Sequence, residues 1–447
     1  MMVTRSKSRA LSIWMNGVQV GTWQLTRQLE TFNYSDEWIS RECARPLSLS
    51  LPFLPGNASH QGDLVNHYFD NLLPDSDVIR RRLASRYQSK SLGAFDLLSQ
   101  LGRDCVGAVQ LLPEGELPAG IHQIQGRALS NEEIADRIRH VSLDSVFGQA
   151  APSNDLSLSI AGAQEKTALL KHDGLWHLPK GSTPTTHIFK LPLGLVGHMR
   201  ADMHTSVENE WLCSKIMTAY GIPTASCEIK YFEDQKVLIV ERFDRRLAAD
   251  GQWIIRLPQE DFCQAMGVSP MNKYQADGGP SITSAMKLLL GSVNAEQDRI
   301  HFFKTQIIFW LLAATDGHGK NFSIAHLPGA QYKGTPIYDV LSAHPVIGFG
   351  ANQIAPHRVK LAMAARGSTN HYLLDKIHRR HWLSQAQQAG LGAGVAQQLI
   401  EEIIEMTQSV INQVRSTISE PFPMAMAESI FTGIKMQARK LASRIES

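Results

Sequence analysis

The stretch Ala314-Thr-Asp-Gly-His-Gly-Lys-Asn-Phe322, followed by Ile337-Tyr-Asp339, is the most informative part of this 447-residue sequence. It places an Asp at 316, an Asn at 321 and a second Asp at 339. Enzymes that transfer a phosphoryl group from ATP use one carboxylate to orient the attacking hydroxyl, and an amide oxygen with another carboxylate to hold Mg²⁺ on the phosphates. The pattern therefore predicts phosphoryl transfer, with Asp316 as the catalytic residue and Asn321 and Asp339 as magnesium ligands.

A helix end would place similar residues here, because Thr315, Asp316 and Asn321 are all good capping residues. The surrounding order favours the functional interpretation. An apolar helix, a Gly-rich loop, a short strand over 322–325 and a strand ending at Asp339 reproduce the order of a protein-kinase catalytic segment. The His-Arg-Asp and Asp-Phe-Gly motifs of ordinary protein kinases are missing from the sequence, which predicts kinase chemistry on a divergent scaffold.

Composition indicates a folded cytoplasmic protein. The chain is 43% hydrophobic and 19% charged, and its length predicts two or three domains. A net charge of +2 gives no argument for nucleic acid or membrane binding. The five cysteines are scattered without a Cys-x-x-Cys pair, which is typical of reduced thiols. No signal peptide is expected at the N-terminus, and the longest apolar run, 307–314, is too short to cross a bilayer.

Changes along the chain predict four regions. Short strand candidates are frequent before position 257, and long segments with helical periodicity follow it. The predicted fold is therefore α+β and bilobal, resembling a protein kinase, with an N-terminal α/β subdomain and an all-α C-terminal lobe. The expected regions are an N-terminal subdomain (1–112), a connector with a short helix (113–150), a β-rich ATP-binding region (151–257) and an α-helical lobe with the catalytic loop (258–447).

Local patterns predict individual elements. Asn16-Gly17 predicts a hairpin between strands 11–15 and 18–23, because both central positions accept a positive φ. The alternating segment 47–51 predicts a half-buried strand, and periodicity predicts helix within 76–101. Further helices are expected at 281–291, 297–314, 371–389, 394–418 and 424–445.

Lys190 is the candidate phosphate-binding lysine. It lies in the apolar strand His187-Ile-Phe-Lys-Leu191, where a lysine commonly points to solvent from an edge strand. Here it follows a Gly-rich segment and precedes a helix with two carboxylates, the order expected for a lysine paired with a helix glutamate. Glu210 is favoured as the partner, and spacing leaves Glu208 open.

Other residues are candidates for contact with ATP. Ala161, Gly162 and Ala163 would let backbone N–H groups approach phosphate oxygens, although a tight strand turn would look the same. Residues 238–243 resemble a hinge whose backbone contacts adenine, whereas most such strands are simply core. His318 and Lys320 either brace the loop and meet phosphate charge or are solvated loop residues. The full set of candidates is Ala161, Gly162, Ala163, Gln164, Lys166, Lys190, Glu241, Phe243, His318 and Lys320.

Long motifs over nearly the whole chain resemble the HipA family, the serine/threonine kinase toxins of bacterial type II toxin–antitoxin modules. The motifs are Ala44-Arg-Pro-Leu-Ser-Leu-Ser-Leu-Pro52, Tyr68-Phe-Asp-Asn-Leu-Leu-Pro-Asp-Ser76, Gly102-Arg-Asp104, Leu158-Ser-Ile-Ala-Gly-Ala-Gln-Glu-Lys-Thr-Ala-Leu169, Pro179-Lys-Gly-Ser-Thr-Pro-Thr-Thr-His-Ile-Phe-Lys190, Val240-Glu-Arg-Phe-Asp-Arg-Arg246, Arg256-Leu-Pro-Gln-Glu-Asp261 and the catalytic stretch 314–322.

The resemblance implies a bilobal kinase with an extra N-terminal subdomain, using ATP and Mg²⁺. It also implies a helix-turn-helix antitoxin partner resembling HipB, a complex of the two on operator DNA, and an aminoacyl-tRNA synthetase as substrate, most often the glutamyl enzyme. Phosphorylation of the synthetase would stop translation and produce dormant, persistent cells. The matched positions are Ser159 for autophosphorylation, Lys190 for ATP, Glu241 and Phe243 for adenine, Asp316 for catalysis, and Asn321 with Asp339 for metal.

Two of these implications have ordinary alternatives. A serine before a small-residue turn, such as Ser159, usually just hydrogen-bonds the backbone. Phosphorylation there would instead add negative charge beside the ATP phosphates and favour self-inhibition. The cluster Lys376-Ile-His-Arg-Arg-His381 is a candidate DNA contact through Lys376, Arg379 and Arg380, whereas a charge run is usually a solvated face.

Two rival functions remain at this level. A small-molecule or lipid phosphotransferase shares the Asp-x-x-x-x-Asn arrangement. A co-repressor scaffold that binds a helix-turn-helix partner without catalysis is the non-enzymatic alternative, against which the intact Lys190, Asp316, Asn321 and Asp339 argue.

Overall fold

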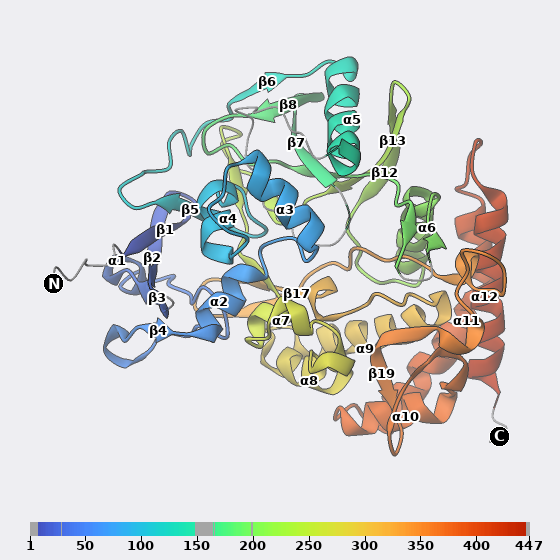
Figure 1. Ribbon diagram of the computed structural model, residues 1–447. Coiled ribbons are helices and arrows are strands. Elements are labelled where there is room, and N and C mark those ends of the chain that lie inside the picture. The colour runs from blue at the N-terminus through green and yellow to red at the C-terminus, as the bar shows by residue number, and fades with distance from the viewer. Residues whose placement is uncertain (1–7, 28, 148–163, 165, 198–199, 444–447) are drawn as a thin grey trace.

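The chain folds into an N-terminal α/β unit, a sheet with a helix on each face, and a mainly helical part that contains the C-terminus (Figure 1). This computed structural model describes residues 8–27, 29–147, 164, 166–197 and 200–443, without the side chains of 142–147. None of the helices in these ranges has the length and apolar character that crossing a membrane requires.

The N-terminal unit is built on a five-stranded antiparallel sheet in the order β4-β3-β2-β1-β5. The predicted hairpin is confirmed, because Asn16 (φ 47°) and Gly17 (φ 83°) turn between its first two strands. Trp23 stacks on Phe69 with ring centroids 4.0 Å apart in the core beneath the sheet. The elements are β1 (Arg9–Met15), β2 (Val18–Thr26), β3 (Leu29–Tyr34), β4 (His60–Gln61), β5 (Val109–Pro113), α1 (Asp36–Ile39), α2 (Asp63–Asp70), α3 (Asp77–Arg86) and α4 (Ala94–Leu101).

Two local predictions in this unit need correction. Residues 47–51 are not a strand and form one isolated bridge between Ser48 and Leu51. Their polar groups bind the other part of the chain instead: the Ser48 hydroxyl and the Leu49 amide both donate to the buried Glu260 carboxylate. The helical pattern over 76–101 corresponds to two helices, α3 and α4, separated by a turn in which Gln88 has a φ of 52°.

The central sheet has six strands in the order β12-β13-β9-β7-β8-β6, all antiparallel. Alternate residues of β13 face opposite helices: Val237 and Ile239 pack in the cluster that contains α5, and Leu238 and Val240 in the cluster that contains α6. The elements are β6 (Gly126–Ala128), α5 (Asn131–Phe147), β7 (Lys166–His172), β8 (Leu175–Pro179), β9 (His187–Lys190), β10 (Leu195–Val196), β11 (Ala201–Asp202), α6 (Ser206–Ala219), β12 (Cys227–Phe232) and β13 (Gln235–Glu241).

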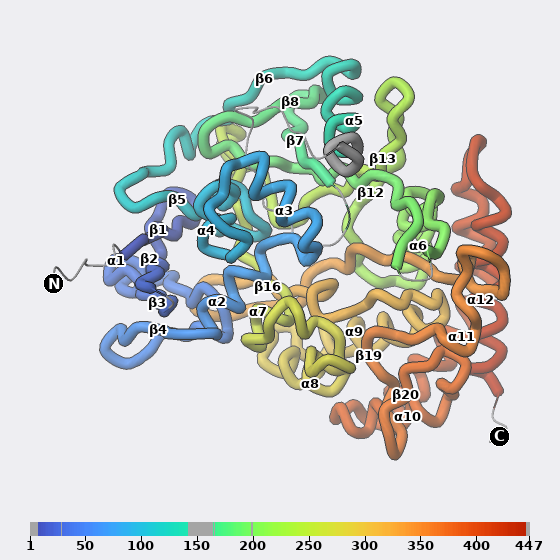
Figure 2. Tube along the Cα trace, viewed as in Figure 1, coloured from blue at the N-terminus to red at the C-terminus, as the bar shows by residue number. Residues whose placement is uncertain are grey.

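The helical part packs around α9 (Ala295–Leu312), which is buried on every side from Phe302 to Leu312, as an apolar helix in a large core must be. Figure 2 shows α12 along the outer edge of the molecule, beside α11 and reaching α6. Its other helices are α7 (Phe262–Ala265), α8 (Ile282–Leu288), α10 (Arg379–Gln388), α11 (Ala393–Arg415) and α12 (Met424–Ala442).

The bilobal α+β expectation holds, but the lobe after 258 is not all-helical. It contains a three-stranded sheet, and a hairpin precedes the expected helix over 371–389, which begins at Arg379. The segment Leu-Ala-Met-Ala-Ala within β19 has strong helix formers, and strand pairing with burial overrides that preference. The strands of this lobe are β16 (Gln259–Asp261), β17 (Ser323–His326), β18 (Tyr332–Gly334), β19 (Lys360–Arg366) and β20 (Asn370–Leu373), and the hairpin of β14 (Arg245–Leu247) and β15 (Ile254–Arg256) precedes the lobe.

Candidate active site

Lys190, at the end of β9, forms ion pairs with two carboxylates. Its Nζ lies 2.5 Å from Oε1 of Glu210 on α6 and 2.5 Å from Oδ1 of Asp339. The Lys190 and Glu210 side chains are both buried. The open choice of helix glutamate is thereby decided, because Glu208 pairs with Lys236 on β13 instead.

The competition of two carboxylates for one ammonium separates their proton affinities. Burial favours the neutral form of Asp339, but the charges of Lys190 and Lys166 outweigh it and hold the Asp339 pKa below its usual range. For Glu210 burial dominates over the attraction of Lys190 and raises the pKa to about 7. Lys190 has its pKa raised, since the two carboxylates outweigh its burial, so it stays charged.

Lys166, the first residue of β7, stands opposite Lys190 in the strand register. Burial, together with the like charge of Lys190, lowers the Lys166 pKa to about 8, although Asp339 acts in the opposite direction. Gln164 donates from Nε2 to the Leu191 carbonyl at 2.6 Å. The remaining candidates of this segment, Ser159, Ala161, Gly162 and Ala163, lie outside the described residues.

The loop after α9 holds the other candidates. The helix ends at Ala313 in the left-handed region (φ 50°), and this turns the chain into the sequence 314–322. The amide nitrogen of Asn321 donates to the Asp339 carbonyl at 3.4 Å, which ties the two candidate metal ligands together. Asp339 itself has a φ of 63°, a conformation that non-glycine residues adopt rarely and that is often found at functional sites.

Asp316 is the exposed member of this loop, with 61% of its side chain accessible. The hydroxyl of Tyr274 donates to its Oδ1, and Nε2 of His318 lies 3.8 Å from the same oxygen. His318 is buried, and its Nδ1 has no hydrogen-bond partner among the described residues. Asp316 therefore presents a carboxylate to solvent while one of its oxygens is held from behind.

Lys320 is not the solvated loop residue that the sequence allowed. Its Nζ lies 2.5 Å from Oδ1 of Asp75, and 4% of its side chain is exposed. Asp75 also binds Nζ of Lys273, at 2.8 Å through Oδ2. Burial opposes ionisation of Asp75, but the two lysines outweigh it and lower its pKa to about 2. Asp75 comes from the N-terminal unit and was not a predicted site residue, since Pro74-Asp75-Ser76 has the composition of an ordinary helix start.

The candidate hinge comprises the last residues of β13 and the two residues after it. Glu241 is exposed, and the Phe243 ring packs against Tyr338 with centroids 5.7 Å apart. A pocket lies beside the hinge and next to the carboxylates of Glu210 and Asp339. Its lining consists of Glu210, Ser214, Thr224, Ala225, Cys227, Val240, Tyr338, Asp339 and Val340.

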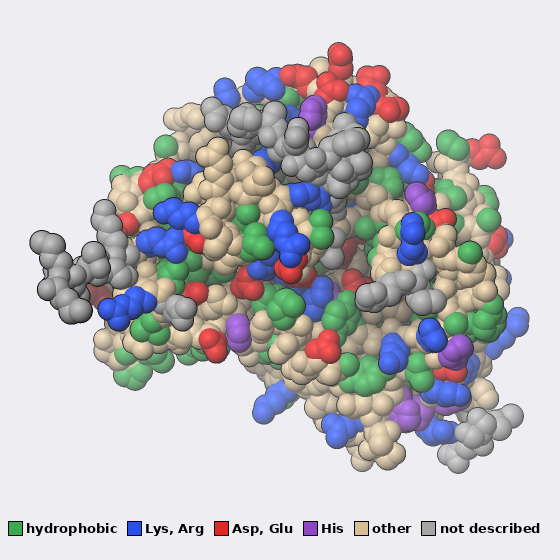
Figure 3. Space-filling model, viewed as in Figure 1, with side chains coloured by type: hydrophobic (Ala, Val, Ile, Leu, Met, Phe, Trp, Pro, Cys, Tyr) green, Lys and Arg blue, Asp and Glu red, His purple; other side chains and the backbone are tan. Residues whose placement is uncertain are grey.

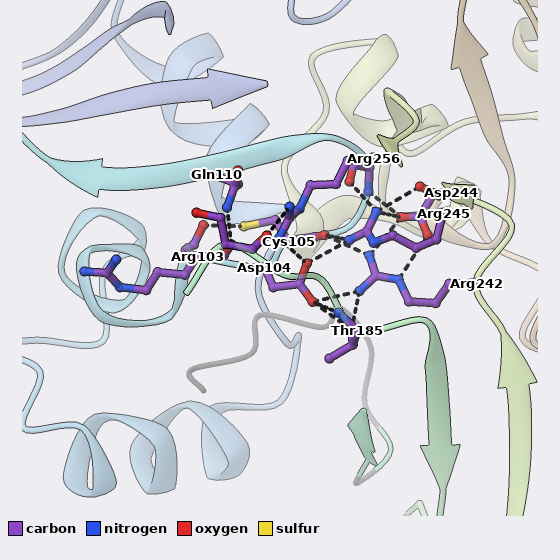
Figure 4. A network of polar contacts seen from close by, with 12 residues as sticks. Arg103, Asp104, Cys105, Gln110, Thr185, Arg242, Asp244, Arg245 and Arg256 are labelled. Carbon is purple, nitrogen blue, oxygen red and sulfur yellow. Dashed lines mark hydrogen bonds and ion pairs between the residues drawn. The ribbon is translucent and has the colours of Figure 1, made fainter. Parts of the chain in front are cut away.

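A buried ionic network lies directly behind the hinge, and it was not predicted from the sequence (Figure 4). The carboxylate of Asp104, from the N-terminal unit, contacts Arg242 at 3.4 Å, Arg245 at 3.0 Å and Arg256 at 3.2 Å. Arg242 also binds Asp244 at 2.8 Å. Burial disfavours the charged form of Asp104, but the three guanidinium groups hold its pKa below the usual range. The hinge is thus fixed to the N-terminal unit.

The candidate DNA contacts lie far from this site in the sequence, around the start of α10. Lys376 and Arg380 are exposed, whereas Arg379 has 11% of its side chain accessible and pairs with Glu401 of α11 at 2.6 Å. Figure 3 shows Lys, Arg and His side chains gathered on the lower part of the molecule, where Figure 1 labels α10 and β19. Arg379 is mainly a packing residue, and the other two reach the surface.

Comparison with known proteins shows the family of the chain. The family model of the HipA-like C-terminal domain matches residues 158–413, and that of the HipA N-terminal domain matches 11–112. The chain belongs to the HipA family. The putative kinase Y4mE of Sinorhizobium fredii is 32% identical over 422 residues, which are 92% of this chain and 93% of that protein.

More distant HipA relatives complete the comparison. The serine/threonine-protein kinase toxin HipA of Shewanella oneidensis is 27% identical over 357 residues, 76% of each chain. A solved complex of Shewanella oneidensis HipA with HipB and operator DNA contains a chain that matches with a TM-score of 0.77 at 22% identity, covering 97% of both chains. The fold is therefore that of HipA, and the chain is a serine/threonine kinase of this family.

Proposed function

We propose that this HipA-family kinase is the toxin of a type II toxin–antitoxin system and transfers phosphate from ATP, with Mg²⁺, to serine or threonine of a protein. The observation that carries the proposal is the joint placement of Lys190, Glu210 and Asp339 in one ion-paired group, with Asn321 bonded to the Asp339 backbone. Phosphoryl transfer needs positioning and charge neutralisation rather than covalent chemistry, and this group supplies both.

The residues fit ATP and magnesium. A carboxylate with an amide oxygen suits Mg²⁺, which is commonly held by one or two protein ligands together with substrate phosphates. When bound, the metal would neutralise charge on the phosphates. Lys190 and Lys166 bind phosphate oxygens. The buried Nδ1 of His318, which has no hydrogen-bond partner within the described part of the chain, is a further polar atom available to a ligand. The backbone at Glu241 and Phe243 contacts adenine.

Residues near the two ends of the loop 314–322 have different roles in this proposal. Asp316 orients the acceptor hydroxyl and takes its proton, since its carboxylate is exposed to an approaching protein. Asn321, at the other end of the loop, and Asp339 would hold the metal, which would neutralise phosphate charge. Lys320 forms an ion pair with Asp75, so its contribution to ATP binding is indirect.

The partners follow from the family. We infer a HipB-like helix-turn-helix antitoxin, a complex with operator DNA in which Lys376 and Arg380 approach phosphates, and an aminoacyl-tRNA synthetase, the glutamyl enzyme, as substrate in the cytoplasm. Phosphorylation of the synthetase would halt translation and promote persistence. Self-phosphorylation at Ser159 would place negative charge beside the ATP phosphates and switch the kinase off.

The test is the intact mass of the protein before and after incubation with ATP and Mg²⁺, following phosphatase treatment. The parent is expected to gain phosphate that maps to Ser159, and Asp316→Gln to gain none while still binding ATP. Ser159→Ala separates the modification site from the activity. A phosphatase-treated parent that binds ATP and gains no phosphate, on itself or on a synthetase, would contradict the proposal.

A further inference from the structure

Tyr274 lies between α7 and α8 and places its hydroxyl on the carboxylate of Asp316. Its ring packs edge-on against His318, with centroids 5.1 Å apart. The hydroxyl and the His318 Nε2 approach the same oxygen, Oδ1, of Asp316. One oxygen of an otherwise exposed carboxylate is thus held, and Oδ2 is left for another group.

The backbone beside Tyr274 is fixed to the same loop and to its surroundings. The Lys273 carbonyl accepts a hydrogen bond from the Gly319 amide at 3.1 Å, and the Lys273 ammonium binds Asp75. On the other side of Tyr274, the Gln275 side chain accepts from the Ala364 amide at 2.8 Å. The phenol is therefore anchored from both neighbouring residues, and its hydroxyl position is set by the fold.

The Tyr274 hydroxyl also stays protonated, so it can always donate this hydrogen bond. Burial and the neighbouring Asp316 carboxylate raise the Tyr274 pKa above its ordinary value, so it keeps its proton throughout the physiological range. An exposed Asp without such a donor would exchange between rotamers, and catalytic geometry is sensitive to displacements well below 1 Å.

We propose that Tyr274 is a positioning residue for phosphoryl transfer, whose hydroxyl holds Oδ1 of Asp316 so that Oδ2 meets the acceptor hydroxyl. The inference rests on the proposed kinase function. In the reaction the acceptor oxygen forms a bond to the γ-phosphorus while the bond from that phosphorus to the ADP oxygen breaks. The acceptor proton passes to Oδ2 of Asp316, and Tyr274 keeps its own.

The experiment compares Tyr274→Phe with Tyr231→Phe, a matched change at an exposed tyrosine on β12. Phosphate incorporation is followed by intact mass under single-turnover conditions over a series of ATP concentrations, with thermal unfolding measured in parallel. We expect Tyr274→Phe to lower the maximal rate about tenfold, the loss expected for one hydrogen bond to a charged group. The half-saturating ATP concentration and the melting temperature should match those of Tyr231→Phe.

Other outcomes overturn the inference in distinguishable ways. An unchanged maximal rate would show that the hydroxyl does not position Asp316, and a higher rate would show that it blocks the acceptor position. Parallel changes in rate, ATP dependence and melting temperature would indicate a general structural role. A parent protein that incorporates no phosphate would overturn the proposed function, and the inference with it.

Discussion

The substitution Asp75→Asn removes one charge from the N-terminal unit and leaves two lysines without their shared carboxylate. Lys320 and Lys273 lie 2.5 and 2.8 Å from the two oxygens of Asp75, and the side chains of all three residues are largely buried. Asn keeps the shape and one acceptor oxygen, so the change tests the charge. The affected lysines lie in, or are bonded to, the catalytic loop.

The size of the expected stability loss follows from the Asp75 pKa, which the lysines lower from 3.8 to about 2 despite burial. One pKa unit is worth about 1.36 kcal/mol, so the carboxylate contributes about 2 kcal/mol to the free energy of unfolding. Because the pKa in the folded state is the lower one, this contribution is complete above pH 3.8 and is lost as the pH falls toward 2. It is therefore fully present at pH 7.5.

The assay is urea unfolding at pH 7.5 together with the rate of phosphate incorporation. Asp70→Asn is the matched control, because Asp70 pairs with Arg80 inside the N-terminal unit at 2.7 Å and does not contact the loop. We expect Asp75→Asn to lower the free energy of unfolding by about 2 kcal/mol. It should also slow phosphate incorporation more than Asp70→Asn does. A second substitution, Lys320→Met, should restore part of the stability, because it removes one of the two buried lysines that have lost their carboxylate. Equal stability and equal rates for Asp75→Asn and Asp70→Asn would refute the reasoning.

Three further predictions concern the site and the surface. Glu210→Gln should lower the rate of phosphate incorporation about tenfold in single-turnover measurements, whereas Glu208→Gln, which affects the pair with Lys236, should stay near the parent. Because the Lys166 pKa is about 8, its charge is lost as the pH rises through 8, and the half-saturating ATP concentration should increase between pH 7 and 9; Lys166→Met should remove this dependence. In operator binding with the antitoxin, Arg380→Ala should reduce the slope of log affinity against log salt by about one, while Arg379→Ala should mainly lower the melting temperature, since Arg379 pairs with Glu401.

The parts of the site that local spacing encodes could be predicted from the sequence. Asp316 and Asn321 share one loop, and Asp339 follows a short strand, so their relation needs no knowledge of distant contacts. Lys190 was found because a lysine in an apolar strand before an acidic helix is a recognisable order. The structure shows that Lys190 contacts Glu210 and Asp339 and that Asn321 contacts Asp339. The roles of these residues in catalysis stay predictions.

The parts that depend on distant contacts could not be predicted. Asp75 and Lys320 are 245 positions apart, and Asp75 looks like an ordinary residue before a helix. Tyr274 and Asp316 are 42 positions apart, in a segment without regular periodicity. The strand expected over 47–51 is absent for the same reason, because the Ser48 hydroxyl and the Leu49 amide bind Glu260 across the chain rather than a neighbouring strand.

Three buried acids join the N-terminal unit to the kinase part, two of them at the catalytic loop and behind the hinge. Asp75 reaches the catalytic loop, Asp104 reaches the arginines behind the hinge, and Glu260 of the helical part holds 48–49 of the N-terminal unit. Charged groups this deeply buried are costly unless each partner is present, so removal of the unit would leave several unpaired cations beside the hinge and the loop. The N-terminal unit is thus a structural component of the active site, and a kinase part expressed alone is expected to lose both stability and catalytic geometry.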